Sequence, residues 1–66
     1  MTVKAMRVNA NLTQEQVADE LGISRLTYRR KENGSHEFLF SELCKLCDLF
    51  GVELEDFRKA IFLESD

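Results

Sequence analysis

A cluster of basic side chains is the feature of this sequence with the clearest chemical consequence. Arg25, Arg29, Arg30 and Lys31 place four of the nine lysines and arginines within seven residues. On an α-helix, Arg25, Leu26, Arg29 and Arg30 would share one face, over an arc of about 140°. An arginine can donate two hydrogen bonds to guanine O6 and N7 in the major groove, and a leucine can contact the thymine methyl. This pattern predicts a face that reads bases; the alternative is a solvated helix face without a ligand.

Polar and charged residues near this cluster could bind the DNA backbone. Helix N-termini and the polar side chains beside them bind phosphates. We expect Lys31 to contact phosphate as a cation, together with the polar side chains of Gln14, Ser24, Thr27 and Asn33. The net charge is -3, but residues 1–31 carry +3 and the remainder carries -6. A concentrated basic patch can bind a polyanion even on an acidic protein.

Other reactive residues give weaker signals. Cys44 and Cys47 are spaced three apart, but a structural zinc site needs about four ligands and only His36 could add a further soft one. We expect the two cysteines to pack in the core, with a redox or metal role as the alternative. His36 is expected in a surface loop, where a DNA backbone contact is the alternative. We find no nucleophile–base pair and no phosphate-binding glycine loop, so we expect no enzymatic activity, no cofactor and no small-molecule substrate.

Several properties bound the architecture. A length of 66 residues allows one domain, 1–66. The sequence has no proline and only three glycines, which favours helices. We see no secretory signal and no apolar run near the roughly 20 residues of a membrane span, so we expect a cytoplasmic protein without a membrane partner.

Apolar spacing and capping residues predict an all-α fold of five helices. Thr13 with Gln16 fits a capping box, and Ser24 can cap the next helix. Gly22, Asn33-Gly34 and Gly51 are typical helix stops. The predicted helices are Val3–Ala10, Gln14–Leu21, Arg25–Glu32, Phe40–Phe50 and Leu54–Leu63. Only Gly22–Ser24 separates the second helix from the third, which predicts a helix-turn-helix over about residues 14–32.

Four segments in this order resemble the phage-repressor and Cro-type (XRE-like) helix-turn-helix family. They are Leu-Thr-Gln-Glu-Gln-Val-Ala from residue 12, Leu-Gly-Ile-Ser from 21, Glu-Asn-Gly from 32 and Leu-Phe-Gly-Val-Glu-Leu-Glu-Asp-Phe from 49. The resemblance implies a compact lambda-repressor-like domain that binds double-stranded DNA as a homodimer on a near-palindromic operator. It also implies that the third helix lies in the major groove.

The resemblance also implies roles for single residues. Base contacts fall on Ser24, Arg25, Leu26 and Arg30, contacts to base or backbone on Arg29 and Asn33, and a phosphate contact on Gln14. We count Arg29 with the base-reading residues and Asn33 with the backbone contacts. Arg7 and Glu32 match a pair that in the family often joins the first helix to the end of the third, so we expect a structural ion pair. Lys31 departs from the family, which usually has an aromatic residue or leucine there.

The function that these observations favour is a small sequence-specific transcriptional regulator, of the kind of a phage or mobile-element repressor. The alternative is a protein-interaction module of the same fold, such as an antitoxin-like or co-regulator component. An apolar excess has two explanations, a well-filled core or a dimer interface; it comprises Phe38, Phe40, Phe50, Phe62 and Leu63.

Overall fold

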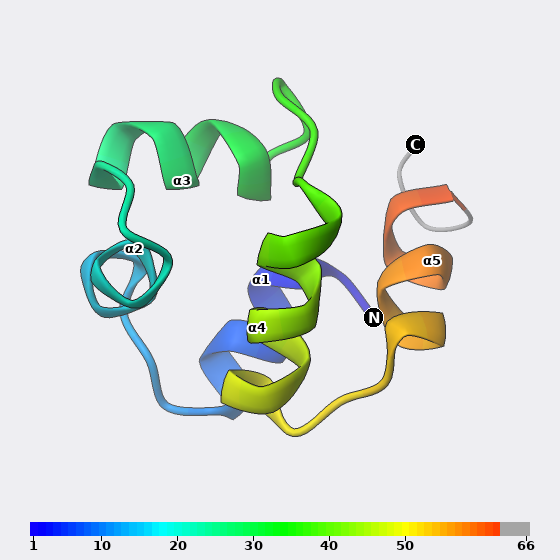
Figure 1. Ribbon diagram of the computed structural model, residues 1–66. Helices are drawn as coiled ribbons and strands as arrows, with labels where there is room; N and C mark the ends of the chain where they lie inside the picture. Colours follow the sequence, from blue (N-terminus) through cyan, green and yellow to red (C-terminus); the bar gives the residue numbers. More distant parts are fainter. Residues whose placement is uncertain (63–66) are drawn as a thin grey trace.

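The computed structural model describes residues 1–62, which form five α-helices around one core (Figure 1). The helix bounds are α1 Val3–Asn9, α2 Gln14–Leu21, α3 Arg25–Glu32, α4 Phe40–Phe50 and α5 Leu54–Phe62. Helices α2 and α3 lie on one side of α4, and α5 lies on the other. The predicted bounds of α2, α3 and α4 are confirmed. The first helix ends one residue earlier than predicted, because Ala10 is its C-cap, and the predicted end of the last, Leu63, lies outside the described residues.

Side-chain caps begin the helices that carry the helix-turn-helix. The Thr13 hydroxyl accepts from the Gln16 amide at 3.1 Å, and the Gln16 side chain accepts from the Thr13 amide at 2.9 Å. The Ser24 hydroxyl accepts from the Thr27 amide at 3.1 Å. Gly22 ends α2 with a φ of 71°, a left-handed conformation that a Cβ would strain. These contacts fix where α2 ends and α3 begins. Because the connection is short, the two helices cross each other at a steep angle (Figure 1).

Every helix contributes to the core. The buried apolar residues are Val3, Met6, Val17, Ala18, Tyr28, Leu46, Phe50, Phe57 and Ala60. The Tyr28 ring lies 6.1 Å from that of Phe38, between centroids, which ties α3 to the segment before α4. Within residues 1–62, Tyr28 is therefore the one buried apolar side chain that packs α3 against the core. Polar contacts must supply the rest of the attachment of α3 to the other helices.

The apolar excess divides between core and surface. Phe50 is buried and Phe38 partly buried, whereas Phe40 is 69% exposed and Phe62 74% exposed. Leu63 lies outside the described residues. Filling of the core thus accounts for only part of this excess.

The two cysteines lie on α4, both partly buried and free of a disulfide. Cys47 packs against the core, as expected, and burial raises the pKa of its thiol. Residues 1–62 hold no group of three or more side chains suited to a metal ion. Across the same residues, no helix has the length and apolar character needed to cross a membrane.

Candidate nucleic-acid interface

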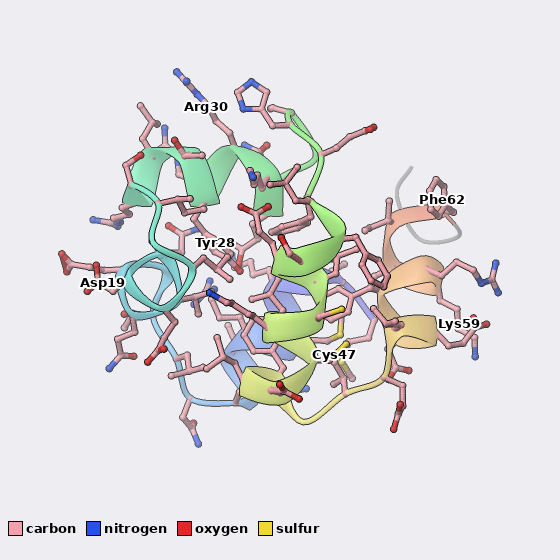
Figure 2. The ribbon with its side chains drawn as sticks, viewed as in Figure 1. Asp19, Tyr28, Arg30, Cys47, Lys59 and Phe62 are labelled. Atoms are coloured by element: carbon pink, nitrogen blue, oxygen red, sulfur yellow. The ribbon has the colours of Figure 1, made fainter. Side chains whose placement is uncertain are left out.

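Helix α3 has an inner and an outer face with different chemistry. Tyr28, on the inner face, is fully buried. The outer face carries four exposed side chains, which we call the reading face: Arg25, Leu26, Arg29 and Arg30. Arg30 points away from the body of the protein, whereas Tyr28 points into it (Figure 2). The structure thus brings the sequence-predicted base-reading arginines and leucine onto one open surface.

A polar cluster centred on Glu32, the Glu32 cluster, holds the end of α3 to the first two helices. Glu32 Oε1 accepts from Arg7 Nε at 2.7 Å and from the Tyr28 hydroxyl at 3.0 Å. Its Oε2 accepts from Gln14 Nε2 at 2.9 Å. Arg7 Nη1 also donates to the Leu12 carbonyl at 2.8 Å. The two side chains that the resemblance paired, Arg7 and Glu32, are only 10% and 5% exposed.

Electrostatics within the Glu32 cluster favour the ion pair. Burial pushes the pKa of Glu32 upward, but hydrogen bonds from Arg7, Gln14 and Tyr28 outweigh it and leave that pKa below its usual value. The hydrogen bond to Glu32 raises the pKa of Arg7. Burial, with the Glu32 charge adding to it, raises the pKa of Tyr28 well above its usual value. The cluster therefore keeps a neutral tyrosine and two opposite charges together, with the hydrogen bonds that a buried pair requires.

A second ion pair attaches α3 to α4. Lys31 Nζ donates to Glu42 Oε1, and the two side chains are 12% and 9% exposed. The same Glu42 oxygen accepts from the Leu39 amide at 2.8 Å, which compensates for the lack of a side-chain cap at Leu39. Hydrogen bonds from Lys31 and Leu39 lower the pKa of Glu42 against the opposing effect of burial. The ammonium group of Lys31 is therefore turned toward α4, and we propose that it stays paired with Glu42 rather than binding phosphate as the sequence predicts.

The predicted backbone-contact residues have partners within the protein. Gln14 is partly buried and donates to Glu32. The Ser24 hydroxyl donates to the Thr27 hydroxyl at 2.9 Å, and Asn33 Oδ1 accepts from the Ser35 amide at 2.9 Å. These residues lie around the reading face but stabilise its helix ends and turns. His36 is exposed in the loop after α3.

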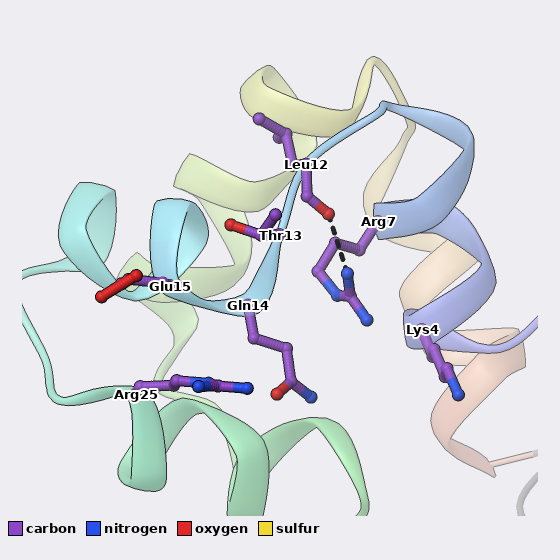
Figure 3. Close-up of a pocket in the computed structure, with 7 residues that line it drawn as sticks. All are labelled: Lys4, Arg7, Leu12, Thr13, Gln14, Glu15 and Arg25. Carbon is purple, nitrogen blue, oxygen red and sulfur yellow. Dashed lines mark hydrogen bonds between the residues drawn. The ribbon is translucent and has the colours of Figure 1, made fainter.

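An open hollow beside the N-terminal end of α2 extends the basic surface (Figure 3). We call it the basic hollow; it is lined by Lys4, Arg7, Leu12, Thr13, Gln14, Glu15 and Arg25. Arg25 extends across it alongside Gln14, and Lys4 approaches from α1 (Figure 3). The charge of Arg7 is neutralised by Glu32. The remaining cations of the basic hollow are Lys4 and Arg25, and Glu15 adds an opposing charge.

Sequence reasoning missed Lys4 as a member of this surface. The signal lay in its spacing from Arg7, since side chains three apart lie on the same side of a helix. Nothing in the local sequence, however, indicated that this side of α1 would lie near α3. That proximity depends on the Glu32 cluster, which joins Arg7 of α1 to α3 and, through Gln14, to α2.

A capped α2, a short glycine turn and a third helix with an exposed basic face define the class of helix-turn-helix proteins. The family model for helix-turn-helix proteins matches residues 3–57, and the chain belongs to this family. The chain is 38% identical over 64 residues to a protein of Methanocaldococcus jannaschii named as an uncharacterized HTH-type transcriptional regulator, MJ0272. That alignment covers 97% of this chain and 91% of the relative. No solved structure matches the chain significantly.

Proposed function

We propose that this protein is a sequence-specific, DNA-binding transcriptional regulator that places the reading face of α3 in the major groove. The observation that carries the proposal is the division of α3 between its two faces. The inner face is fixed by Tyr28 and Glu32, while three arginines and a leucine are left exposed on the outer face. A rigid helix with free hydrogen-bond donors is suited to reading base edges.

The basic hollow supports a contact to the phosphate backbone next to that groove. Lys4 and Arg25 line it together with Thr13, the N-cap of α2. A helix N-terminus with neighbouring cations is a favourable anion environment. We propose that Lys4 and the start of α2 fix the position of the protein on the duplex, while the reading face selects the sequence.

A near-palindromic operator bound by a homodimer is part of the same proposal. Three exposed apolar side chains are Leu39, just before α4, Phe40 on α4 and Phe62 on α5. Exposed apolar groups can be covered by association, and a twofold dimer would present two reading faces to two half-sites. Bound to such an operator, the protein would act as a repressor by occupying it.

The experiment that tests this function is selection from a random pool of duplex DNA at about 0.1 M salt. We expect enrichment of an inverted repeat whose half-sites lie about one helical turn apart. Enrichment of a single half-site would support DNA reading without the dimer. No enrichment by a protein that circular dichroism shows to be folded would overturn the proposal.

The exposed apolar side chains Leu39, Phe40 and Phe62 favour a second candidate, a protein-interaction module of the same fold. In that case the arginines of α3 would have no role in base recognition. The same selection separates the two functions, because an interaction module enriches no sequence. Sedimentation of the protein without DNA then shows whether Leu39, Phe40 and Phe62 already join two copies, and their replacement by serine should abolish such a dimer.

A further inference from the structure

We infer, on the basis of the function proposed above, that Leu26 and Arg30 form a specificity pair. Leu26 would contact a thymine methyl group, and Arg30 would donate to O6 and N7 of a guanine. Four residues of an α-helix rise about 6 Å, and successive bases of one DNA strand are about 3.4 Å apart. The preferred half-site would thus contain a T·A pair and a G·C pair about two base-pair steps apart.

The reading face offers hydrogen-bond donors and no acceptors. A guanidinium group has five donors and no acceptor, and Leu26 has neither. Bidentate contact with adenine needs an asparagine or glutamine, and contact with the cytosine amino group needs an acceptor. The nearest amides are engaged within the protein, since Gln14 donates to Glu32 and Asn33 Oδ1 accepts from Ser35. Guanine is therefore the base that this face can bind through two hydrogen bonds.

Leu26 is the apolar component of the reading face. It is 45% exposed and lies on α3 between Arg25 and Arg29. The neighbouring Ser24 hydroxyl already donates its proton to the Thr27 hydroxyl within the protein. Removing a methyl group from water against Leu26 would favour thymine over cytosine at this position.

Arg30 is a better partner for Leu26 than Arg25. Leu26 and Arg30 are four residues apart, so they lie on one ridge of α3, and Arg30 points away from the protein (Figure 2). Arg25 instead lines the basic hollow beside Gln14 (Figure 3). Arg29 lies about 40° from Arg25 around the helix axis, on the ridge of that residue. The specificity pair is accordingly Leu26 with Arg30.

Base analogues in the selected DNA site test this inference atom by atom. In 7-deazaguanine the N7 acceptor is missing, whereas inosine keeps O6 and N7 and lacks only the minor-groove amino group. Uracil differs from thymine by the missing methyl. We expect 7-deazaguanine at the guanine position to weaken binding of the wild-type protein and inosine to leave it unchanged. Uracil at the thymine position should weaken binding about fourfold, the value of one buried methyl or methylene group.

The matched variants show which side chain reads which base. Arg30→Ala should weaken binding to the selected site by about 5- to 150-fold and lose the response to 7-deazaguanine only. Leu26→Ala should lose the response to uracil only. Arg30→Lys keeps the charge but not the two-pronged donor, so it should lose the preference for guanine and keep the salt dependence. Lys59→Ala is the control, because Lys59 is an exposed cation of α5 on another side of the protein (Figure 2).

The outcomes separate this inference from the proposed function. A selected half-site without a thymine and a guanine at this spacing would overturn the specificity pair and leave DNA binding intact. The pair would also be overturned if the wild type and both alanine variants responded alike to 7-deazaguanine, and alike to uracil. No selected sequence from the folded wild-type protein would overturn the proposed function, and the pair with it. Thermal unfolding of each variant is the control for folding; we expect these exposed substitutions to leave the melting temperature unchanged.

Discussion

The inner and outer sides of α3 carry the same kinds of basic groups in opposite situations. On the inner side, Lys31 of α3 and Arg7 of the neighbouring α1 each face a largely buried carboxylate, Glu42 and Glu32 respectively. On the outer side, Arg29 and Arg30 are exposed, and no ion pair engages either of them within residues 1–62. A cation on or beside α3 is thus available to a ligand only where the fold has not supplied a carboxylate. The difference lies in the partner, not in the side chain.

The largest effect should come from breaking the Glu32 cluster. Arg7→Ala leaves the buried Glu32 carboxylate without its cation, and losing one member of a buried pair costs about 3–5 kcal/mol. Urea unfolding measures the loss. Arg58→Ala is the control, because Arg58 pairs with Glu55 in a contact where both side chains are more than half exposed, and such pairs contribute little. Equal stability of the Arg7 variant and the wild type would show that the pair is dispensable.

Acidification should weaken the same inner contacts more gently. The pKa values of Glu32 and Glu42 are lowered in the folded protein, so these groups stay ionised at a pH where the unfolded chain takes up protons. The stability that these two carboxylates contribute is therefore fully present above the ordinary carboxyl pKa of 4.5. It is lost as the pH drops through the lowered pKa values of the folded protein. Unfolding free energies measured from pH 6 downward should show this decline, with a shallower slope in Glu32→Gln. An identical slope in that variant would contradict the role of Glu32.

On the outer side, Arg30→Ala should reduce affinity for the preferred site by about 1–3 kcal/mol and leave the melting temperature unchanged. The reason is that Arg30 is exposed and, in the proposed function, its donors serve DNA alone. Fluorescence anisotropy with the selected site and with a scrambled duplex measures both affinities. Equal losses on the two duplexes would assign Arg30 to the phosphate backbone.

The smallest effects distinguish Lys4 from Lys31. Lys4→Ala should weaken all duplexes alike and reduce the slope of log affinity against log salt by about 1, because Lys4 lines the basic hollow. Lys31→Met should leave that slope unchanged, because its ammonium group is held by Glu42. Titrations at several salt concentrations compare the two variants. A reduced slope in Lys31→Met would show that Lys31 leaves Glu42 when DNA binds.

The helices of the helix-turn-helix could be predicted because their signals are local. Thr13 with Gln16, Gly22 and Ser24 act within one turn of where they stand, so the bounds of α2 and α3 follow from the sequence. The exposed arc of α3 follows from helix geometry in the same way. The end of α1 was misplaced by one residue because fraying ends carry no strong signal.

The contacts of Lys31 and Lys4 could not be predicted in this way. Lys31 stands in a row of cations, and its partner Glu42 lies on another helix. Lys4 is on α1, far along the chain from Arg25, and the two meet only at the basic hollow. A charge by itself indicates neither which carboxylate will approach it nor whether one will.

Capping and helical periodicity are short-range properties, so the five helices, the position of the turn between α2 and α3, and the reading face follow from the sequence. Which cations remain available depends instead on contacts that form when the helices pack together. Folding brings Glu32 and Glu42 to Arg7 and Lys31 and leaves Arg30 exposed. The physical reason is that a buried charge requires a nearby opposite charge, and that partner comes from elements distant in sequence.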